Sequence, residues 1–328
     1  MIAIVPRRPA RDSPATPRSE VSHERQYGVT TGSTSDPCHH RTMRIVHLVG
    51  RSHHRGAEQV ALELADELGS RGDQNRLLSV TLGHEGEQVA DLEPLVAERD
   101  QGARQLLLAA RRFRRELRRE APDVVLAHGA AAALVAVAAS PRRGPSIVWQ
   151  TIVAMAPQSF RGVQGAAWRV AVRRLDGVVA LTTELGDEAR RLGYRGPVWP
   201  IPNARQTARF EHLDRTAEAG RLRSEVGVSP RTAVIGLVGY LVPQKQPEKA
   251  VDVLAELRGA GRDVHLVVAG SGPRSSDVER RAEQRGVRAH VSLVGHRDDV
   301  PQVLAGLDLL ILTSADEGVP GVIIGTVP

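Results

Sequence analysis

The chain has 328 residues, which is enough for roughly two domains that each bury a core of their own. Its 41% hydrophobic and 25% charged residues are typical of a globular protein; no apolar run reaches the roughly 18 to 20 residues of a membrane span, and the N-terminus lacks the apolar core of a signal peptide. The net charge of +6 brings polyanionic partners into consideration.

Residues 1–42 are predicted to form a disordered extension, because they are rich in Pro, Ser, Thr, Arg and His and show no hydrophobic periodicity. The only cysteine of the chain, Cys38, excludes an internal disulfide framework and favours a reducing compartment, so we expect a cytoplasmic protein. Cys38 is followed by His39 and His40, but three neighbouring ligand types without a second cluster predict no metal site. The folded part is expected to begin near Met43.

From residue 43 onward, short apolar strands alternate with amphipathic helices, which predicts a parallel sheet covered by helices. The strands expected in the first half are 45–49, 77–82, 124–127, 147–150, 178–181 and 198–201, and the helices are 57–72, 103–119, 165–175 and 184–192. Together they predict a first domain over 43–205.

The helix expected at 104–119 is strongly basic, with seven arginines against one acid, Glu116. Its apolar residues follow helical spacing, so the arginines decorate the opposite face. A solvated helix face is the simplest interpretation, and contact with anionic lipid head groups at the membrane periphery, or with a phosphorylated acceptor, is the alternative. Nucleic acid is not expected, since no aromatic-studded sheet or recognition helix accompanies the charge.

A polar stretch extending to about residue 228 separates this half from a second alternating series. The second series has strands at 234–238, 264–269, 291–294 and 309–312, with helices at 246–258, 275–285 and 299–306. We therefore predict a second domain over 206–328 and an α/β fold of two doubly wound modules.

In such sheets ligands bind beyond the carboxyl ends of the strands, so the loops there are the candidate sites. In the first half, the loop 50–56, which ends in Gly56, leads into a helix at Ala57, whose free amides favour an anion. His128 stands at the end of the strand 124–127, where an imidazole facing a cleft could donate to a hydroxyl or a phosphate.

In the second half, Lys245 lies near a helix start and could reach a phosphate as a point charge. The tight turn containing Gly270 and Gly272 could lie against a nucleotide. The segment 313–322 combines two adjacent acids with glycines, which suits recognition of sugar hydroxyls. No G-x-G-x-x-G, phosphate-binding P-loop or D-x-D motif accompanies them, which disfavours a nucleotide-dependent oxidoreductase.

Six short motifs occur in one order along the chain: R-G-A-E at 55–58, D-V-V-L-A-H-G at 123–129, I-P-N at 201–203, G-Y-L-V-P-Q-K at 239–245, G-S-G-P at 270–273 and T-S-A-D-E-G-V-P-G-V-I-I at 313–324. On these motifs the chain resembles glycosyltransferase family four, retaining enzymes that move a sugar from a nucleotide diphosphate donor to an acceptor. The resemblance implies a GT-B fold, in which two Rossmann-like doubly wound parallel-sheet domains face a cleft.

The resemblance also implies a role for each motif residue. Lys245 would neutralise the diphosphate of a UDP- or GDP-sugar, His128 would contact the donor sugar, and Glu317 would hold sugar hydroxyls. The remaining donor-binding residues would be Gly56, Gly270, Gly272, Gly318, Gly321 and Val322. No metal or other cofactor is implied, and the acceptor would be a glycan, a lipid or a small molecule of glycan, glycolipid or cell-envelope synthesis.

The sequence departs from the family pattern in its last residues. The second glutamate of the donor motif would fall at Gly325, and the chain ends three residues later. We therefore expect a truncation within the donor-binding motif and an incomplete second domain. The alternative function is a non-catalytic fragment that binds a sugar nucleotide weakly or not at all.

Overall fold

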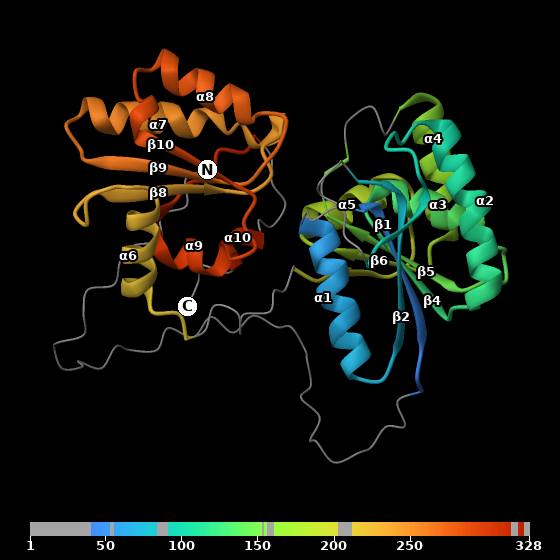
Figure 1. Cartoon of the computed structure of the whole chain (residues 1–328). Coiled ribbons are helices and arrows are strands. Elements are labelled where there is room, and N and C mark those ends of the chain that lie inside the picture. The colour runs from blue at the N-terminus through green and yellow to red at the C-terminus, as the bar shows by residue number, and fades with distance from the viewer. Residues whose placement is uncertain are drawn as a thin grey trace, which may run out of the picture.

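The computed structural model describes residues 41–52, 56–83, 91–152, 154–155, 161–202, 212–315 and 321–324. Nearly all of the predicted extension 1–42, and the predicted domain boundary at 205/206, lie outside these residues. The described chain forms two α/β units, each built on its own sheet (Figure 1).

The first unit contains a seven-stranded sheet in which every pairing is parallel, with the order β3-β2-β1-β4-β5-β6-β7. Its strands are β1 (Arg44–Ser52), β2 (Gln74–Leu82), β3 (Glu93–Val96), β4 (Val124–His128), β5 (Ser146–Thr151), β6 (Gly177–Ala180) and β7 (Val198–Pro200). The order runs outward from β1 in both directions, which is the doubly wound arrangement predicted from the sequence.

Helices cover both faces of this sheet. They are α1 (Gly56–Ser70), α2 (Ala103–Glu120), α3 (Ala130–Ala139), α4 (Gly162–Ala171) and α5 (Thr183–Arg191), with the short 3₁₀ turn η2 (Val172–Arg174). Helix α1 lies on one side of the sheet and α2 to α4 on the other (Figure 1). The main core forms beneath α2 and α3, where Phe113, Trp149 and Trp168 are fully buried and the two indole rings lie 5.0 Å apart.

Two elements of the first unit differ from expectation. Helix α3 was not predicted because its ten residues are all Ala, Leu or Val, so no polar face marks a helical period. Strand β3 was not predicted either, since its four residues, Glu-Pro-Leu-Val, are too few to show the alternation typical of a strand.

The second unit contains a four-stranded parallel sheet with the order β10-β9-β8-β11. Its strands are β8 (Ala233–Val238), β9 (Val264–Ala269), β10 (Val291–Gly295) and β11 (Leu309–Leu310). Its helices are α6 (Arg215–Glu225), α7 (Glu248–Gly259), α8 (Ser275–Gln284), α9 (Val300–Gly306) and α10 (Gly321–Ile324), with 3₁₀ turns η4 (Pro243–Lys245) and η5 (Arg288–His290).

The second sheet is covered on both faces. Helices α7 and α8 lie on one face and α6, α9 and α10 on the other (Figure 1). Each face has its own core, one containing Leu254 of α7 and Val278 of α8, the other containing Leu222 of α6 and Leu304 of α9. The two halves thus share an architecture but not a core, and the predicted α/β fold of two Rossmann-like modules is confirmed.

Helix α6 occupies part of the segment that the sequence analysis treated as a polar linker. Asp214 caps its first turn by accepting hydrogen bonds from the amides of Thr216 and Ala217 at 2.9 and 3.2 Å. The helix contains few apolar residues, so its sequence shows no clear hydrophobic periodicity and did not predict a helix.

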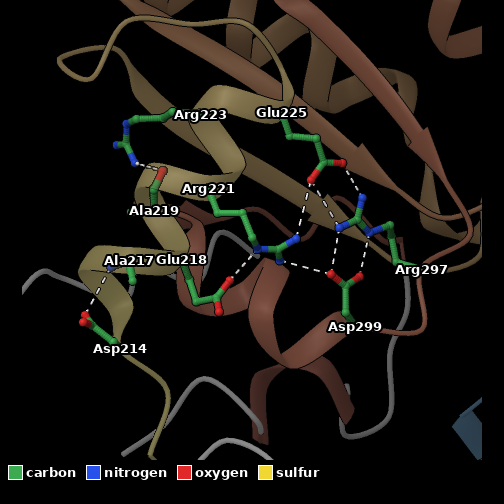
Figure 2. A network of polar contacts seen from close by, with 9 residues as sticks. All are labelled: Asp214, Ala217, Glu218, Ala219, Arg221, Arg223, Glu225, Arg297 and Asp299. Atoms are coloured by element: carbon green, nitrogen blue, oxygen red, sulfur yellow. Dashed lines mark hydrogen bonds and ion pairs between the residues drawn. The ribbon is translucent and has the colours of Figure 1, made fainter.

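A network of charges then joins α6 to the start of α9 (Figure 2). Arg221 contacts Glu218 at 2.7 Å and Asp299 at 3.0 Å. Arg297, which precedes α9, lies between Asp299, 2.7 Å away, and Glu225. These carboxylates raise the pKa of Arg297, and the two arginines lower the pKa of Asp299, so Arg297 and Asp299 are both charged at neutral pH.

Candidate functional site

The loops that follow β8 and β9 are joined by backbone hydrogen bonds. The amide of Gly239 donates to the carbonyl of Ala269 at 2.9 Å, and the amide of Leu241 donates to the carbonyl of Ser271 at 2.8 Å. The amide of Arg274 donates back to the carbonyl of Leu241 at 3.0 Å. Two loops far apart in sequence therefore form one rigid platform at the carboxyl edge of the second sheet.

Gly270 and Gly272 make this close approach possible. Both have positive φ, +144° and +153°, and an added Cβ would lie 2.0 Å from the carbonyl oxygen of Gly239 and 2.4 Å from that of Leu241, respectively. Backbone packing alone therefore requires glycine at both positions. Their predicted contact with the donor remains a prediction.

Lys245 belongs to this platform. It ends η4, its side chain is half-buried, and an added Cβ at Gly239 would lie 4.0 Å from its Cε, so the lysine stem passes over Gly239. The Thr313 hydroxyl donates to the Lys245 carbonyl at 2.8 Å, and the Ala315 amide donates to the Gln244 carbonyl at 2.9 Å. These two hydrogen bonds join the segment that carries Lys245 to the beginning of the motif at 313–324.

The remaining predicted residues of this motif are only partly described. Glu317 and Gly318 lie outside the described residues. Gly321 begins α10, and the half-buried side chain of Val322 packs against the core of the α6–α9 face. Val322 would therefore meet a ligand through its backbone, since its side chain is used in packing.

In the first unit, Gly56 is the first residue of α1 and is exposed. An added Cβ there would meet nothing within 4 Å, in contrast to Gly270 and Gly272. The space in front of this helix end is open on the side of Gly56, as a backbone contact with an anion requires. The three residues that precede Gly56 lie outside the described residues.

His128 differs from the expected cleft-facing imidazole, because it is buried with 3% of its surface exposed. Its Nε2 lies 3.2 Å from Nδ1 of His47, and its Nδ1 is hydrogen-bonded to Oε1 of Gln150. His47 in turn contacts Asn75 Oδ1 through Nε2 at 3.1 Å. The four side chains form a polar row across β2, β1, β4 and β5, the adjacent central strands of the sheet.

Burial keeps both imidazoles of this row neutral. It lowers the pKa of His128 to about 3, with the neighbouring His47 adding to the effect. It lowers the pKa of His47 to about 4, against the opposing hydrogen bond from Asn75. At neutral pH each ring carries a single hydrogen, so when His47 donates to Asn75 Oδ1 and His128 donates to Gln150 Oε1, no hydrogen is left between the two ring nitrogens at their shared contact.

Sequence reasoning missed three members of this row: His47, Asn75 and Gln150. The sequence could have indicated His47, because this histidine interrupts the apolar run Ile-Val-His-Leu-Val of β1. A polar side chain in a buried strand needs a hydrogen-bond partner inside the protein. Asn75 and Gln150 carried no such signal, because polar residues near strand ends are common in loops and edges.

Metal-binding clusters and membrane-spanning helices are two further features that the described part of the chain could contain. There, no three His, Cys, Asp or Glu side chains converge as a metal site would require. None of the helices described combines the length and the apolar character needed to cross a bilayer.

Comparison with known families identifies both halves of the chain. Residues 54–209 match the family "Glycosyltransferase Family 4", and residues 220–324 match "Glycosyl transferases group 1". The two matches occur in chain order and together span most of the protein.

Individual relatives of this chain are named as enzymes that transfer sugars. The chain is 33% identical over 161 residues to 2-deoxystreptamine glucosyltransferase of Streptomyces kanamyceticus, covering 48% of this chain and 41% of the relative. It is 32% identical over 158 residues to alpha-D-kanosaminyltransferase of the same organism, covering 46% of this chain and 40% of the relative. The aligned part therefore spans about two-fifths of the length of these relatives.

Solved structures share the fold. Anabaena Alr3699/HepE in complex with UDP-glucose superposes with a TM-score of 0.68 at 21% identity, covering 87% of this chain and 78% of that one. WaaG, a glycosyltransferase of lipopolysaccharide biosynthesis, superposes with a TM-score of 0.66 at 17% identity, covering 85% and 77%. With two matching family modules on two doubly wound units, this chain belongs to the glycosyltransferases of the GT-B fold.

Proposed function

We propose that this chain transfers a sugar from a nucleotide diphosphate sugar to an acceptor. The observation that carries the proposal is the platform of the second unit, where Lys245 is joined through Thr313 to the motif that contains Glu317. It supports the proposal that a basic group and a sugar-binding carboxylate meet beyond the carboxyl edge of the sheet, where ligands of open α/β sheets bind.

In this proposal the chain acts by positioning and by charge. The Lys245 ammonium stabilises the diphosphate as it departs, and Glu317 accepts hydrogen bonds from sugar hydroxyls. His128 contacts the donor sugar through the edge of a neutral imidazole, because burial lowers its pKa to about 3 and its two ring nitrogens face His47 and Gln150. Gly56, Gly318 and Gly321 supply backbone amides. Retention of the anomeric configuration and independence from metal are part of the proposal and come from the family resemblance.

The donor and the acceptor are proposed by class. Structures of Alr3699/HepE contain UDP or UDP-glucose, which supports a uridine donor here, with a GDP-sugar as the alternative. One relative is named for a 2-deoxystreptamine acceptor and another for the lipopolysaccharide core, which supports a small-molecule or glycolipid acceptor.

A lysine substitution tests the donor site. Lys245→Ala is expected to weaken UDP binding by about 10- to 100-fold, because a charge-assisted hydrogen bond contributes about 1.5 to 3 kcal/mol. Isothermal titration calorimetry with UDP and GDP measures this on the full chain. Lys249→Ala is the matched control, since Lys249 is exposed on the following helix and is expected to leave the affinity unchanged.

Turnover is measured as nucleotide release from a panel of UDP- and GDP-sugars with glycan, lipid and aminocyclitol acceptors. Nucleotide release that depends on an acceptor and falls in Lys245→Ala is the expected result. Absence of binding for every nucleotide tested would contradict the donor site, and binding without turnover would favour the non-catalytic alternative.

We also propose that α2 contacts an anionic membrane surface. Arg104, Leu107 and Arg111 lie on one exposed face of this helix, and Leu107 is 63% exposed. Arginines near an anionic leaflet each contribute about 1 kcal/mol, and an exposed leucine between them can insert among head groups.

Vesicle flotation tests this contact. The chain is expected to float with phosphatidylglycerol vesicles and not with phosphatidylcholine vesicles, and Arg104→Gln combined with Arg111→Gln is expected to reduce flotation several-fold. Arg231→Gln, an exposed arginine of the second unit, serves as the control. Flotation that is equal for both lipids would contradict an electrostatic contact.

A further inference from the structure

A hollow of about 330 Å³ opens in the first unit, away from the proposed donor platform. Arginines and prolines make up most of its lining, with Arg114 and Arg118 from α2 and Arg143 from the turn before β5. Pro122 lies two residues before β4 and Pro145 immediately precedes β5, so the hollow lies at the amino ends of these strands. His128 is at the opposite end of β4, which separates the hollow from the residues assigned to sugar transfer.

Three arginines from two segments line this hollow without a balancing acid. Arg114 and Arg118 are one helical turn apart on α2, and Arg143 comes from the turn before β5. Among the described residues, none of the three forms an ion pair, whereas Arg119 of the same helix pairs with Glu116 at 2.7 Å. Like charges spaced in this way repel, so the arrangement costs stability when no anion is present.

Helix electrostatics explain only part of this cluster. The carbonyl end of a helix attracts cations in its last turn, which accounts for Arg118. Arg114 is one turn further from that end, and Arg143 is on a different segment. The helix end therefore accounts for one of the three arginines and leaves the other two unexplained.

The walls of the hollow are rigid. Arg143 is carried by the turn Pro-Arg-Arg-Gly-Pro, and an added Cβ at Gly144 would lie 3.0 Å from the ring of Pro141. On the other side, Ala121 ends α2 in the left-handed conformation with φ 41°, which an alanine rarely adopts. Proline rings and a packed turn restrict the backbone that presents the arginines.

We propose that this hollow is a second anion site that binds the phosphoryl group of a ligand. Guanidinium groups match phosphate oxygens in a bidentate fork, and three arginines that line one hollow suit a phosphate or a diphosphate. The volume falls at the lower end of the range for small-molecule pockets, about 300 to 1,000 Å³. The phosphate could belong to a soluble phosphorylated metabolite or to a lipid head group. The site is independent of the proposed glycosyl transfer.

Calorimetry with inorganic pyrophosphate tests the site in a chain carrying Lys245→Gln, so that the proposed donor site does not contribute. Each of Arg114→Gln, Arg118→Gln and Arg143→Gln is expected to weaken pyrophosphate binding by about tenfold or more, the effect of one charged hydrogen bond. Arg115→Gln is the matched control, because Arg115 is exposed beside Arg114 and does not line the hollow. Circular dichroism checks that every variant is folded.

A vesicle experiment distinguishes the two sources of phosphate. If the ligand is soluble, pyrophosphate binding depends on the three arginines, and flotation with phosphatidylglycerol vesicles is the same for the Arg143→Gln and Arg142→Gln chains, because Arg142 is exposed beside Arg143 and does not line the hollow. If it is a lipid head group, Arg143→Gln reduces flotation several-fold more than Arg142→Gln does. The proposal would be overturned if Arg143→Gln weakened pyrophosphate binding no more than Arg115→Gln and reduced flotation no more than Arg142→Gln, or if no binding occurred in either experiment. Donor binding by the chain with Lys245 intact is unaffected by that outcome.

Discussion

At the scale of single residues, the most informative feature is the buried contact between His47 and His128. A histidine at the end of a strand suggested a cleft-facing donor, but the neighbouring strands enclose its ring. With Gln150 on one side and His47 on the other, the ring orientation of His128 is set by protein groups. Any contact with a sugar would use a neutral and rigidly held imidazole.

This histidine pair predicts a loss of stability in weak acid. The pKa values of about 3 for His128 and about 4 for His47 in the folded state lie below the value near 6.5 of an unfolded chain. As pH falls from about 6.5 to 4, the unfolded state binds more protons, so each histidine lowers the free energy of unfolding by up to about 1.4 kcal/mol per pH unit, and by less as the pH nears that histidine's folded-state pKa.

Tryptophan fluorescence during urea unfolding measures this effect, because all three tryptophans, Trp149, Trp168 and Trp199, belong to the first unit. In His128→Gln the pH slope between 6.5 and 4 is expected to be shallower by up to about 1.4 kcal/mol per unit, the contribution of one histidine. An unchanged slope would show that the ring is already charged or solvated in the folded protein.

At the scale of elements, helix α6 is held by two kinds of charge. Its outer side uses the network of Figure 2, in which Arg221 contacts Glu218. On its inner side, Arg223 is 6% exposed, pairs with Asp308 and donates to the carbonyls of Thr232 and Ala219 at 3.1 Å each. The inner pair anchors α6 where β8 and β11 begin.

Neutralising the inner acid is therefore expected to cost far more than neutralising the outer one. Asp308→Asn leaves the buried Arg223 cation without its counter-charge and is expected to lower stability by about 3 kcal/mol. Glu218→Gln affects an ion pair near solvent and is expected to cost about 1 kcal/mol or less. Hydrogen exchange of α6 and β8 peptides measures both, and equal exchange rates in the two variants would contradict the anchoring role of Arg223.

At the scale of the whole molecule, the two units have separate cores, and none of the hydrophobic clusters among the described residues contains side chains from both. Separate cores of this kind are characteristic of domains that can unfold one at a time. A substitution in one unit is therefore expected to change the stability of that unit and to leave the stability of the other unchanged.

Asp308→Asn gives a direct test of this independence. It is expected to lower the midpoint of the urea transition seen by circular dichroism while leaving the tryptophan fluorescence transition of the first unit unchanged. A shift of equal size in both signals would show that the two units unfold as a single cooperative body.

The alternation of apolar strands and amphipathic helices determined the fold class, because hydrophobic periodicity is a local property of the chain. It also located most strands and the basic helix α2. The sequence did not predict helices that depend on packing against distant parts of the chain for their stability. Helix α3 is apolar on every side, and α6 is mostly polar, so their helical state depends on what they pack against.

For the candidate site, the sequence by itself determined which motifs are present and their order, and the family resemblance built on those motifs assigned Lys245, Gly270 and Gly272 to one donor site. Only the tertiary structure decided how they act together. It revealed that both glycines are required by a backbone approach to the loop of Gly239, and that His128 is enclosed by His47 and Gln150. Such contacts join residues tens of positions apart, and no local pattern encodes distances that exist only after the strands have paired.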